Sequence, residues 1–255
     1  MADYHKILYS AGQQVARITL NRAEKRNALD EELVGEIRHA LSQSAGDAAV
    51  RVVLLTGAGP DFCSGMDLAA LERVSRASVA ENLADARRLG DLFVEMRHHP
   101  RPIVASVRGR ALAGGCGLAT AADIILAGES AQFGYPEIRI GFVPAIVMAI
   151  LRRSVPERRA FELLATGSVI TAQKAAGIGL INRVFADDAL EGEVERFVVE
   201  LASRSASALT LMKSLLYQTD GISFEAAISA GVQTNTLARL TEDCRRGVEE
   251  FLKKR

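Results

Sequence analysis

The sequence lacks several features that identify whole classes of protein. Its 31 basic and 31 acidic side chains cancel to a formal net charge of zero. No overall electric field therefore favours binding to nucleic acid or to an anionic membrane surface. No stretch approaches the roughly 20 consecutive apolar residues of a membrane-spanning helix. We expect a small-molecule or protein partner, and neither nucleic acid nor membrane.

Cysteine is also scarce. The three cysteines, Cys63, Cys116 and Cys244, are an odd number, lie far apart and form no CxxC pair of the kind found in zinc and redox motifs. The N-terminus shows no basic segment followed by an apolar run, which a targeting sequence would need. These observations predict a reduced, cytoplasmic protein without a bound metal.

The chain does contain enough apolar residues for a full core, since 49% of its 255 residues are apolar. Strand-like runs and helical periodicity alternate along its first part, which predicts an α/β fold. The predicted strands cover residues 16–20, 51–56, 102–107 and 124–126, and the predicted helices cover residues 31–41, 82–96 and 114–122.

The pattern changes near Val184. Beyond it the sequence is helical, in three stretches near residues 187–204, 206–219 and 223–254. We therefore expect a core of residues 1–185 followed by a helical region of residues 186–255.

Two turns rich in small residues follow predicted strands. Residues 114–117 open a short helix, where unpaired N–H groups carry partial positive charge and glycine lets a ligand approach the backbone. Residues 61–68 form a second sharp turn that can present one more N–H group. Two N–H groups that converge on one oxygen would form an oxyanion hole. Tight helix packing is the alternative explanation of the glycines.

A third segment, residues 132–144, holds Glu137 in an apolar loop stiffened by Pro136. Burial raises the pKa of a carboxyl group and suits it to proton transfer near neutral pH. Spacing alone leaves two other possibilities open, a solvated turn residue and an ion pair with Arg139.

Taken in order, these three segments resemble the enoyl-CoA hydratase/isomerase (crotonase) family. Further matches lie at residues 18–29, 101–105, 122–124, 164–167 and 179–182, so the resemblance runs almost from end to end. It implies an α/β, crotonase-like spiral of ββα units with a C-terminal helical trimerisation region. It also implies homotrimers, which pair into hexamers in many members of the family.

The resemblance also implies roles for individual residues. The backbone N–H groups of Met66 and Gly114 would hold a thioester carbonyl and stabilise an enolate, and Glu137 would transfer protons at C2. Coenzyme A, as part of an acyl-CoA substrate, would require no separate cofactor. It would contact the positions Lys25, Arg26, Ala28, Ser64, Asp67 and Leu68, with an ordinary solvated loop as the alternative for the first two.

One position departs from the family pattern. Two-carboxylate hydratases of the family carry a first glutamate three residues after the glycine that matches Gly114, and this chain has Gly117 there. Either Glu137 alone would aim water at C3 and protonate C2, or another acidic group would assist. The candidates for that assistance are Glu72, Glu81, Asp85 and Glu95.

Three functions are compatible with this pattern. The resemblance favours a lyase of fatty acid metabolism that hydrates a 2-enoyl-CoA, and similarity to a hydratase subgroup suggests a 3-methylglutaconyl-CoA-like substrate. An enoyl-CoA (Δ3,Δ2) isomerase, for which one carboxylate suffices, is the second. A non-catalytic acyl-CoA-binding protein is the third.

Two further features would have to be present for other variants of the function. A substrate whose acyl group carries a carboxylate would need a cation in the pocket, such as Arg87 or Arg88. A serine peptidase built on Ser64 would need a histidine nearby.

Overall fold

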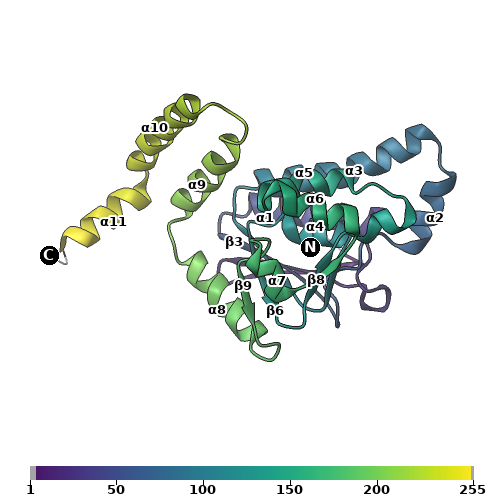
Figure 1. Ribbon diagram of the computed structural model, residues 1–255. Coiled ribbons are helices and arrows are strands. Elements are labelled where there is room, and N and C mark those ends of the chain that lie inside the picture. The colour runs from purple at the N-terminus through teal and green to yellow at the C-terminus, as the bar shows by residue number, and fades with distance from the viewer. Residues whose placement is uncertain (1–3, 254–255) are drawn as a thin grey trace.

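The computed structural model describes residues 4–253, apart from the side chain of Leu68, and a six-stranded sheet organises it (Figure 1). The strand order is β1-β2-β3-β4-β6-β9, with β1 antiparallel to β2 and the other neighbours parallel. These strands are β1 (Ile7–Gly12), β2 (Val15–Leu20), β3 (Val52–Gly57), β4 (Ile103–Val107), β6 (Ile124–Gly128) and β9 (Arg183–Phe185). The four strands expected from the sequence are confirmed as β2, β3, β4 and β6.

A smaller sheet has the order β5-β7-β8, with β5 parallel to β7 and β7 antiparallel to β8. Its strands are β5 (Arg110–Leu112), β7 (Gln132–Gly134) and β8 (Val169–Thr171). This sheet lies between two segments of interest, because β5 precedes the glycine cluster and β7 precedes Glu137.

Helices connect these strands and cover the sheets. They are α1 (Glu31–Gly46), α2 (Leu68–Arg76), α3 (Val79–His98), α4 (Gly114–Thr120), α5 (Ala145–Ser154), α6 (Glu157–Thr166), α7 (Ala172–Gly177), α8 (Leu190–Ala202), α9 (Ala206–Gln218), α10 (Phe224–Leu240) and α11 (Glu242–Lys253). The 3₁₀ helices are η1 (Ala23–Lys25) and η2 (Pro136–Ile140). Asp30 caps α1 as expected, because its side chain accepts a hydrogen bond of 2.9 Å from the Leu33 N–H.

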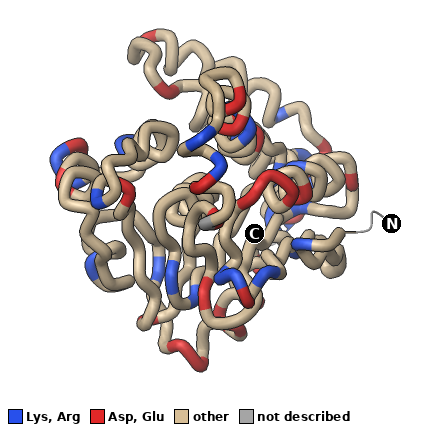
Figure 2. Tube along the Cα trace, turned by 90° about the vertical axis from the view of Figure 1, so that its right-hand side faces the viewer, with Lys and Arg blue, Asp and Glu red and all other residues tan. Residues whose placement is uncertain are grey.

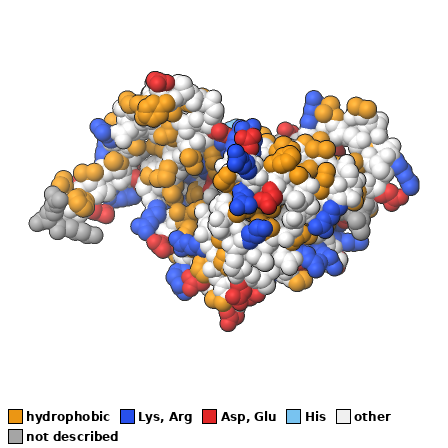
Figure 3. Space-filling model, in the orientation of Figure 1, with side chains coloured by type: hydrophobic (Ala, Val, Ile, Leu, Met, Phe, Trp, Pro, Cys, Tyr) orange, Lys and Arg blue, Asp and Glu red, His pale blue; other side chains and the backbone are white. Residues whose placement is uncertain are grey.

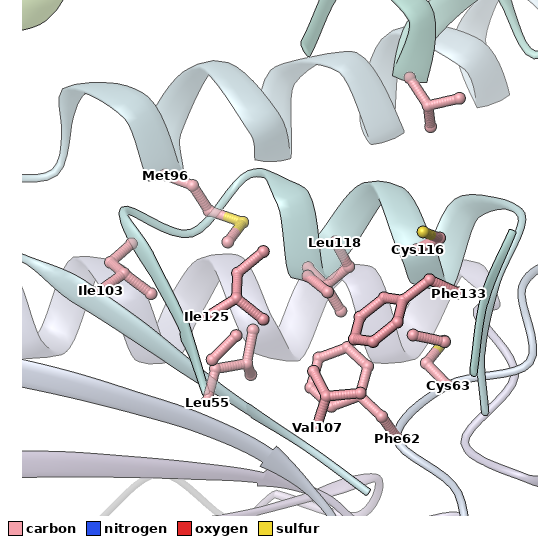
Figure 4. Close-up of a cluster of buried hydrophobic side chains, with 14 of the residues drawn as sticks. Leu55, Phe62, Cys63, Met96, Ile103, Val107, Cys116, Leu118, Ile125 and Phe133 are labelled. Carbon is pink, nitrogen blue, oxygen red and sulfur yellow. The ribbon is translucent and has the colours of Figure 1, made fainter. Parts of the chain in front are cut away.

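The main core lies between the large sheet and helices α1, α3, α4 and α5. Figure 4 shows the rings of Phe62 and Phe133 close to Leu118, all three fully buried. Leu118 belongs to α4, so this cluster anchors the glycine-rich helix to the core.

The opposite face of the large sheet is covered by α8. Val194 and Val198 of that helix pack in one cluster with Val52, Val104 and Leu126 of the strands. Because both faces are covered, β3 and β4 are apolar at nearly every position rather than at alternate ones.

Helices α9, α10 and α11 extend away from the sheets (Figure 1). The third helical stretch expected from the sequence, residues 223–254, is divided within its described part, since α10 ends and α11 begins on either side of Thr241. The Thr241 hydroxyl accepts a hydrogen bond of 3.2 Å from the Cys244 N–H at the start of α11. The division of the chain into residues 1–185 and 186–255 stays a prediction; β9 ends at Phe185 and every later element is helical.

Basic and acidic residues are interspersed along the trace (Figure 2). Within residues 4–253, none of the helices combines the length and the apolar character needed to cross a bilayer. Over the same residues, no three metal-ligating side chains are grouped so as to hold an ion.

Candidate active site

The two turns rich in small residues lie side by side. Cys63 bridges to the chain beside Ala111, with hydrogen bonds of 3.0 Å from its N–H to the Arg110 carbonyl and from the Leu112 N–H to its own carbonyl. Gly65, whose φ is +98°, lets the two turns pack this closely. A β-carbon added at Gly65 would lie 2.8 Å from the Ala113 β-carbon and 3.6 Å from the Gly114 nitrogen. Only glycine fits there, and Met66 follows it directly.

The N–H groups of Met66 and Gly114 make no hydrogen bond to another residue in the described part of the chain. Gly114 is the first residue of α4, so its N–H has no partner within the helix. Both groups can donate to a ligand oxygen, and the start of α4 adds partial positive charge. The two N–H groups predicted from the sequence therefore lie in one place, and neither is bonded to another residue in the described part of the chain.

Ala113, which precedes this helix, has an unusual backbone conformation. Its φ of 50° and ψ of −127° lie in a region that residues with a β-carbon rarely adopt. Its N–H donates a 2.8 Å hydrogen bond to the Gly134 carbonyl on β7. Strain of this kind persists only where the surroundings impose it, and it concentrates at functional sites.

Glu137 stands three residues beyond that β7 carbonyl, in the first turn of η2 after Pro136. Its Oε2 atom is buried and has no hydrogen-bond partner among the described residues. Burial raises the pKa of the Glu137 carboxyl group, against a smaller lowering by a hydrogen bond with its own backbone. No ion pair joins it to Arg139 among the described residues, and Arg139 does not contribute to its pKa shift, so the alternative of a carboxylate neutralised by that arginine finds no support.

The charge of Glu137 acts on the first turn of α4. It contributes to the raised pKa of Cys116, although burial is the main reason that this pKa reaches about 12. The carboxylate is thus near the helix that presents Gly114. A thiol with so high a pKa stays protonated, so Cys116 is unsuited to act as a nucleophile.

The structure also brings together the two segments predicted to contact coenzyme A. The Ser64 N–H donates to the Arg26 carbonyl at 3.0 Å, and the Leu29 N–H donates to the Gly65 carbonyl at 2.7 Å. Lys25 and Arg26 expose their side chains, whereas Ala28 is buried. The side chain of Leu68 lies outside the described residues.

Asp67 has a structural partner that its motif did not reveal. Its side chain caps α2 by accepting from the Ala69 N–H at 2.9 Å, and Arg22 donates to it at 3.1 Å. Burial alone would raise the pKa of Asp67, but these hydrogen bonds lower it overall. Arg22 also donates to the Ala28 carbonyl at 2.5 Å, so one guanidinium ties the two segments together.

Asn27 is a second residue whose role the sequence did not reveal. It is fully buried, and its amide donates to the carbonyls of Ala58 and Asp61 at 2.9 and 2.8 Å. Its φ of 54° is left-handed, a conformation that asparagine tolerates better than most residues. The signal available in the sequence for this role was an asparagine that follows a polar loop.

Gly117 does more than lack a carboxylate. A β-carbon added there would lie 2.3 Å from Cγ1 of Val147 and 3.2 Å from Cζ of Phe93. Both are buried apolar side chains, from α5 and α3 respectively. The space beside this residue is therefore filled as well as uncharged.

The acidic residues considered as substitutes for the missing glutamate all have other partners. Glu81 belongs to the capping box of α3 with Ser78. The remaining contacts are Glu72 with Arg76 at 3.0 Å, Asp85 with Arg88 at 3.2 Å, and Glu95 with Arg38 at 2.5 Å. Arg88 is also 3.4 Å from Glu31, so this proposed cation is engaged by protein carboxylates.

A hydrolase site built on Ser64 finds no support. The serine–histidine hydrogen bond that the described residues contain joins Ser44 to His99 at 3.1 Å, and both residues are buried. Burial lowers the pKa of His99, whose ring also hydrogen-bonds the backbone of Arg101. That pair is part of the packing between α1 and the end of α3.

Comparison with known proteins gives consistent results. The family model described as "Enoyl-CoA hydratase/isomerase" matches residues 10–255. A Thermus thermophilus protein provisionally named as an enoyl-CoA hydratase is 39% identical over 241 residues, covering 94% of this chain and 95% of that protein. The 2,3-dehydroadipyl-CoA hydratase of Escherichia coli is 34% identical over 251 residues, covering 98% and 96%. A crystal structure of enoyl-CoA hydratase from Mycobacterium smegmatis superposes with a TM-score of 0.94 at 31% identity, covering 98% and 97%.

Proposed function

The chain belongs to the enoyl-CoA hydratase/isomerase family, with its crotonase fold, and from that premise we propose that it adds water to a 2-enoyl-CoA thioester through a stabilised enolate. The observation that carries this proposal is the buried, unpartnered Oε2 atom of Glu137 on a loop bonded to the start of α4. Where the Gly114 and Met66 N–H groups can polarise a carbonyl, such a carboxyl group can move protons on the adjacent carbons.

The proposed reaction uses Glu137 twice. As its carboxylate accepts a proton from water, the water oxygen bonds to C3, the C2–C3 π electrons form a C1–C2 double bond, and the carbonyl π electrons move to the thioester oxygen. The Met66 and Gly114 N–H groups stabilise the charge that develops on that oxygen. The protonated Glu137 then gives its proton to C2 as the carbonyl re-forms. Atoms balance, because one water has been added across the double bond.

Coenzyme A would enter as part of the substrate. The exposed side chains of Lys25 and Arg26 are suited to its phosphates, and Arg26 has a carboxylate only at 4.0 Å, from Asp61. The backbone of Ser64, Ala28 and residues 67–68 would border the rest of the coenzyme. No further cofactor is required by this scheme.

Isomerisation of a 3-enoyl-CoA is the second candidate, and the surroundings of Gly117 favour it. A 1,3-proton shift needs one carboxylate, which removes a proton from C2 and returns it to C4 while the double bond moves. The filled space at Gly117 leaves no room for a second carboxylate on α4.

As substrates for hydration, we propose 3-methylglutaconyl-CoA-like thioesters together with 2,3-dehydroadipyl-CoA, the substrate in the name of the Escherichia coli relative.

We also propose that the chain acts as a cytoplasmic homotrimer or dimer of trimers. Apolar side chains gather over the C-terminal helices (Figure 3), and Phe224, Ile228 and Val232 of α10 are 75%, 54% and 62% exposed. Contiguous exposed apolar surface of this kind marks interaction sites. Multi-angle light scattering should give three or six chain masses, and a single chain mass would overturn the assembly.

The first test is proton NMR in D2O with crotonyl-CoA, 3-methylglutaconyl-CoA and a 3-enoyl-CoA. We expect a 3-hydroxyacyl product, and the Glu137→Gln variant should lose roughly 10³-fold in rate. Glu129→Gln, which changes an exposed carboxylate after β6, is the matched control and should retain the rate. Double-bond migration without hydration would establish the isomerase instead. Binding of all three thioesters without turnover would leave a non-catalytic acyl-CoA-binding protein.

A further inference from the structure

The filled space beside Gly117 borders the proposed oxyanion site. Gly117 is three residues after Gly114, so both lie on the same face of α4. Side chains of a helix tilt toward its N-terminus, and a substituent at residue 117 would therefore lean back toward the turn of Gly114. Val147 occupies the position of that substituent.

An apolar wall continues from there along α3. A β-carbon at Gly114 would meet Leu29 at 3.3 Å and Leu89 at 3.9 Å, while one at Gly117 would meet Phe93 at 3.2 Å. Leu89 and Phe93 are four residues apart and share one face of α3. The carbons of an acyl chain whose carbonyl is held at Gly114 would lie against this wall.

Such a wall cannot hold water. An ordered water needs two to four polar partners, and cavities lined by leucine, valine and phenylalanine stay dry. Val147 is 3% exposed and Phe93 is 5% exposed, and valine is stiff about χ1, so neither yields readily to an incoming water. This wall therefore offers no polar partner for a water beside the acyl carbons.

We infer that Val147 is a specificity-determining residue that sets the rate of water addition to a 2-enoyl thioester relative to double-bond migration in a 3-enoyl thioester. The inference rests on the proposed function, because it assumes an enolate formed by Glu137. With one face dry, water attack on C3 of a 2-enoyl thioester is slowed, whereas transfer of a proton from C2 to C4 of a 3-enoyl thioester needs no water. The enzyme would thus hydrate 2-enoyl thioesters, but more slowly than it moves the double bond of 3-enoyl thioesters.

The segment that carries the proton-transfer group also provides one residue of this wall, Val147. Glu137 lies in η2, and α5 begins at Ala145 after a short connection in which the Phe142 N–H donates to the Glu137 carbonyl at 3.0 Å. Val147 is thus ten positions after Glu137 in the sequence. The polar and the dry sides of the site belong to one continuous segment.

The test compares Val147→Ser with Val147→Ala. Both open similar room, but only serine adds a hydroxyl that can hold a water. NMR in D2O measures the ratio of the hydration rate of crotonyl-CoA to the rate of double-bond migration in a 3-enoyl-CoA. We expect this ratio to rise roughly tenfold in Val147→Ser and much less in Val147→Ala. Val194→Ser, at a buried valine of α8 on the far face of the sheet, should leave it unchanged.

Val147→Thr keeps the shape of valine and replaces the serine variant if that one does not fold. A ratio within about twofold of the parent in every folded hydroxyl variant would overturn the inference. Failure of the proposed function looks different, because the unaltered protein would then neither hydrate nor isomerise any of the thioesters. That result would remove the enolate on which both rates depend.

Discussion

The loops around the candidate site and the helices α10 and α11 differ in how many of their side chains are buried or bonded by the rest of the chain. In the loops, Asn27 is fully buried with both amide atoms bonded, and Arg22 bridges two segments. In α10 and α11 no described residue is buried, and Phe224 is 75% exposed. The site is therefore held by contacts within one chain, whereas these helices present apolar surface that the same chain leaves uncovered.

Helix α9 joins the two regions through a buried charge. The Lys213 ammonium donates to Asp123 at 2.7 Å and to the carbonyls of Met96 and Arg101, and the Tyr217 hydroxyl donates to Asp123 at 2.6 Å. Burial lowers the pKa of Lys213 despite the neighbouring carboxylate. The attachment of α9, and through it of α10 and α11, thus depends on this buried polar cluster.

Disrupting this buried cluster should give the largest effect on stability. Lys213→Met leaves the Asp123 charge without its counter-ion, and removing one partner of a buried ion pair costs about 3–5 kcal/mol of unfolding free energy. Urea denaturation followed by circular dichroism measures the loss. Lys174→Met, at an exposed lysine of α7, is the control and should change stability by less than about 0.5 kcal/mol. A similar small change in Lys213→Met would show that α9 is attached by other contacts.

The free N–H group of Gly114 can be removed without breaking a helix bond. Gly114→Pro occupies the first position of α4, where proline is tolerated. Loss of one oxyanion donor should lower kcat by roughly 10²–10³-fold, about 2.7–4 kcal/mol, while Gly114→Ala keeps the donor. Steady-state kinetics on the best thioester compares them. Equal losses in both variants would mean that crowding against Leu29, and not the donor, is responsible.

A smaller effect is expected from crowding at Gly117. Gly117→Ala places a methyl group against Val147, and overpacking of a core typically costs about 1–3 kcal/mol. Combining it with Val147→Ala should recover part of that loss, so the two changes would be non-additive in a double-mutant cycle. Thermal unfolding of the four proteins measures the coupling. Strict additivity would contradict the contact.

The smallest effect concerns pH. Burial raises the pKa of Glu137, so the protonated form favours folding below the ordinary glutamate pKa and this contribution is lost as pH rises through the raised value. Glu137→Gln should therefore raise Tm slightly near pH 7, on the order of 2 °C, with the gain shrinking toward pH 4. Scanning calorimetry across that range tests the sign. A loss of Tm at pH 7 would show that the carboxylate stabilises the fold.

The sequence predicted those parts of the fold that repeat a pattern over many residues. Helix α1 has a cap at Asp30 and a regular apolar face, and β3 is a continuous apolar run. Strand β1 was missed because only Ile7 of its six residues is buried, so no alternation appears. Strands β5, β7 and β8 have three residues each, too few to show a period.

The candidate site was predicted through the resemblance and through Glu137, but the contacts that shape it were not. Val147 reaches Gly117 from another helix, and no spacing in the sequence indicates such a neighbour. Arg22 and Asn27 act across the fold on Asp67 and Ala58, which depends on tertiary structure. Backbone donors are hard to predict for the same reason, because the freedom of an N–H group depends on what surrounds it.

The conformation of Ala113 has a thermodynamic consequence for ligand binding. Glycine at this position would reach the same φ and ψ values without strain, and it would also sample many others. Alanine removes most of those alternatives before any ligand arrives, so the adjacent donor is already fixed in direction. A thioester that binds there loses less conformational entropy on ordering the loop, and more of its contact energy remains as affinity.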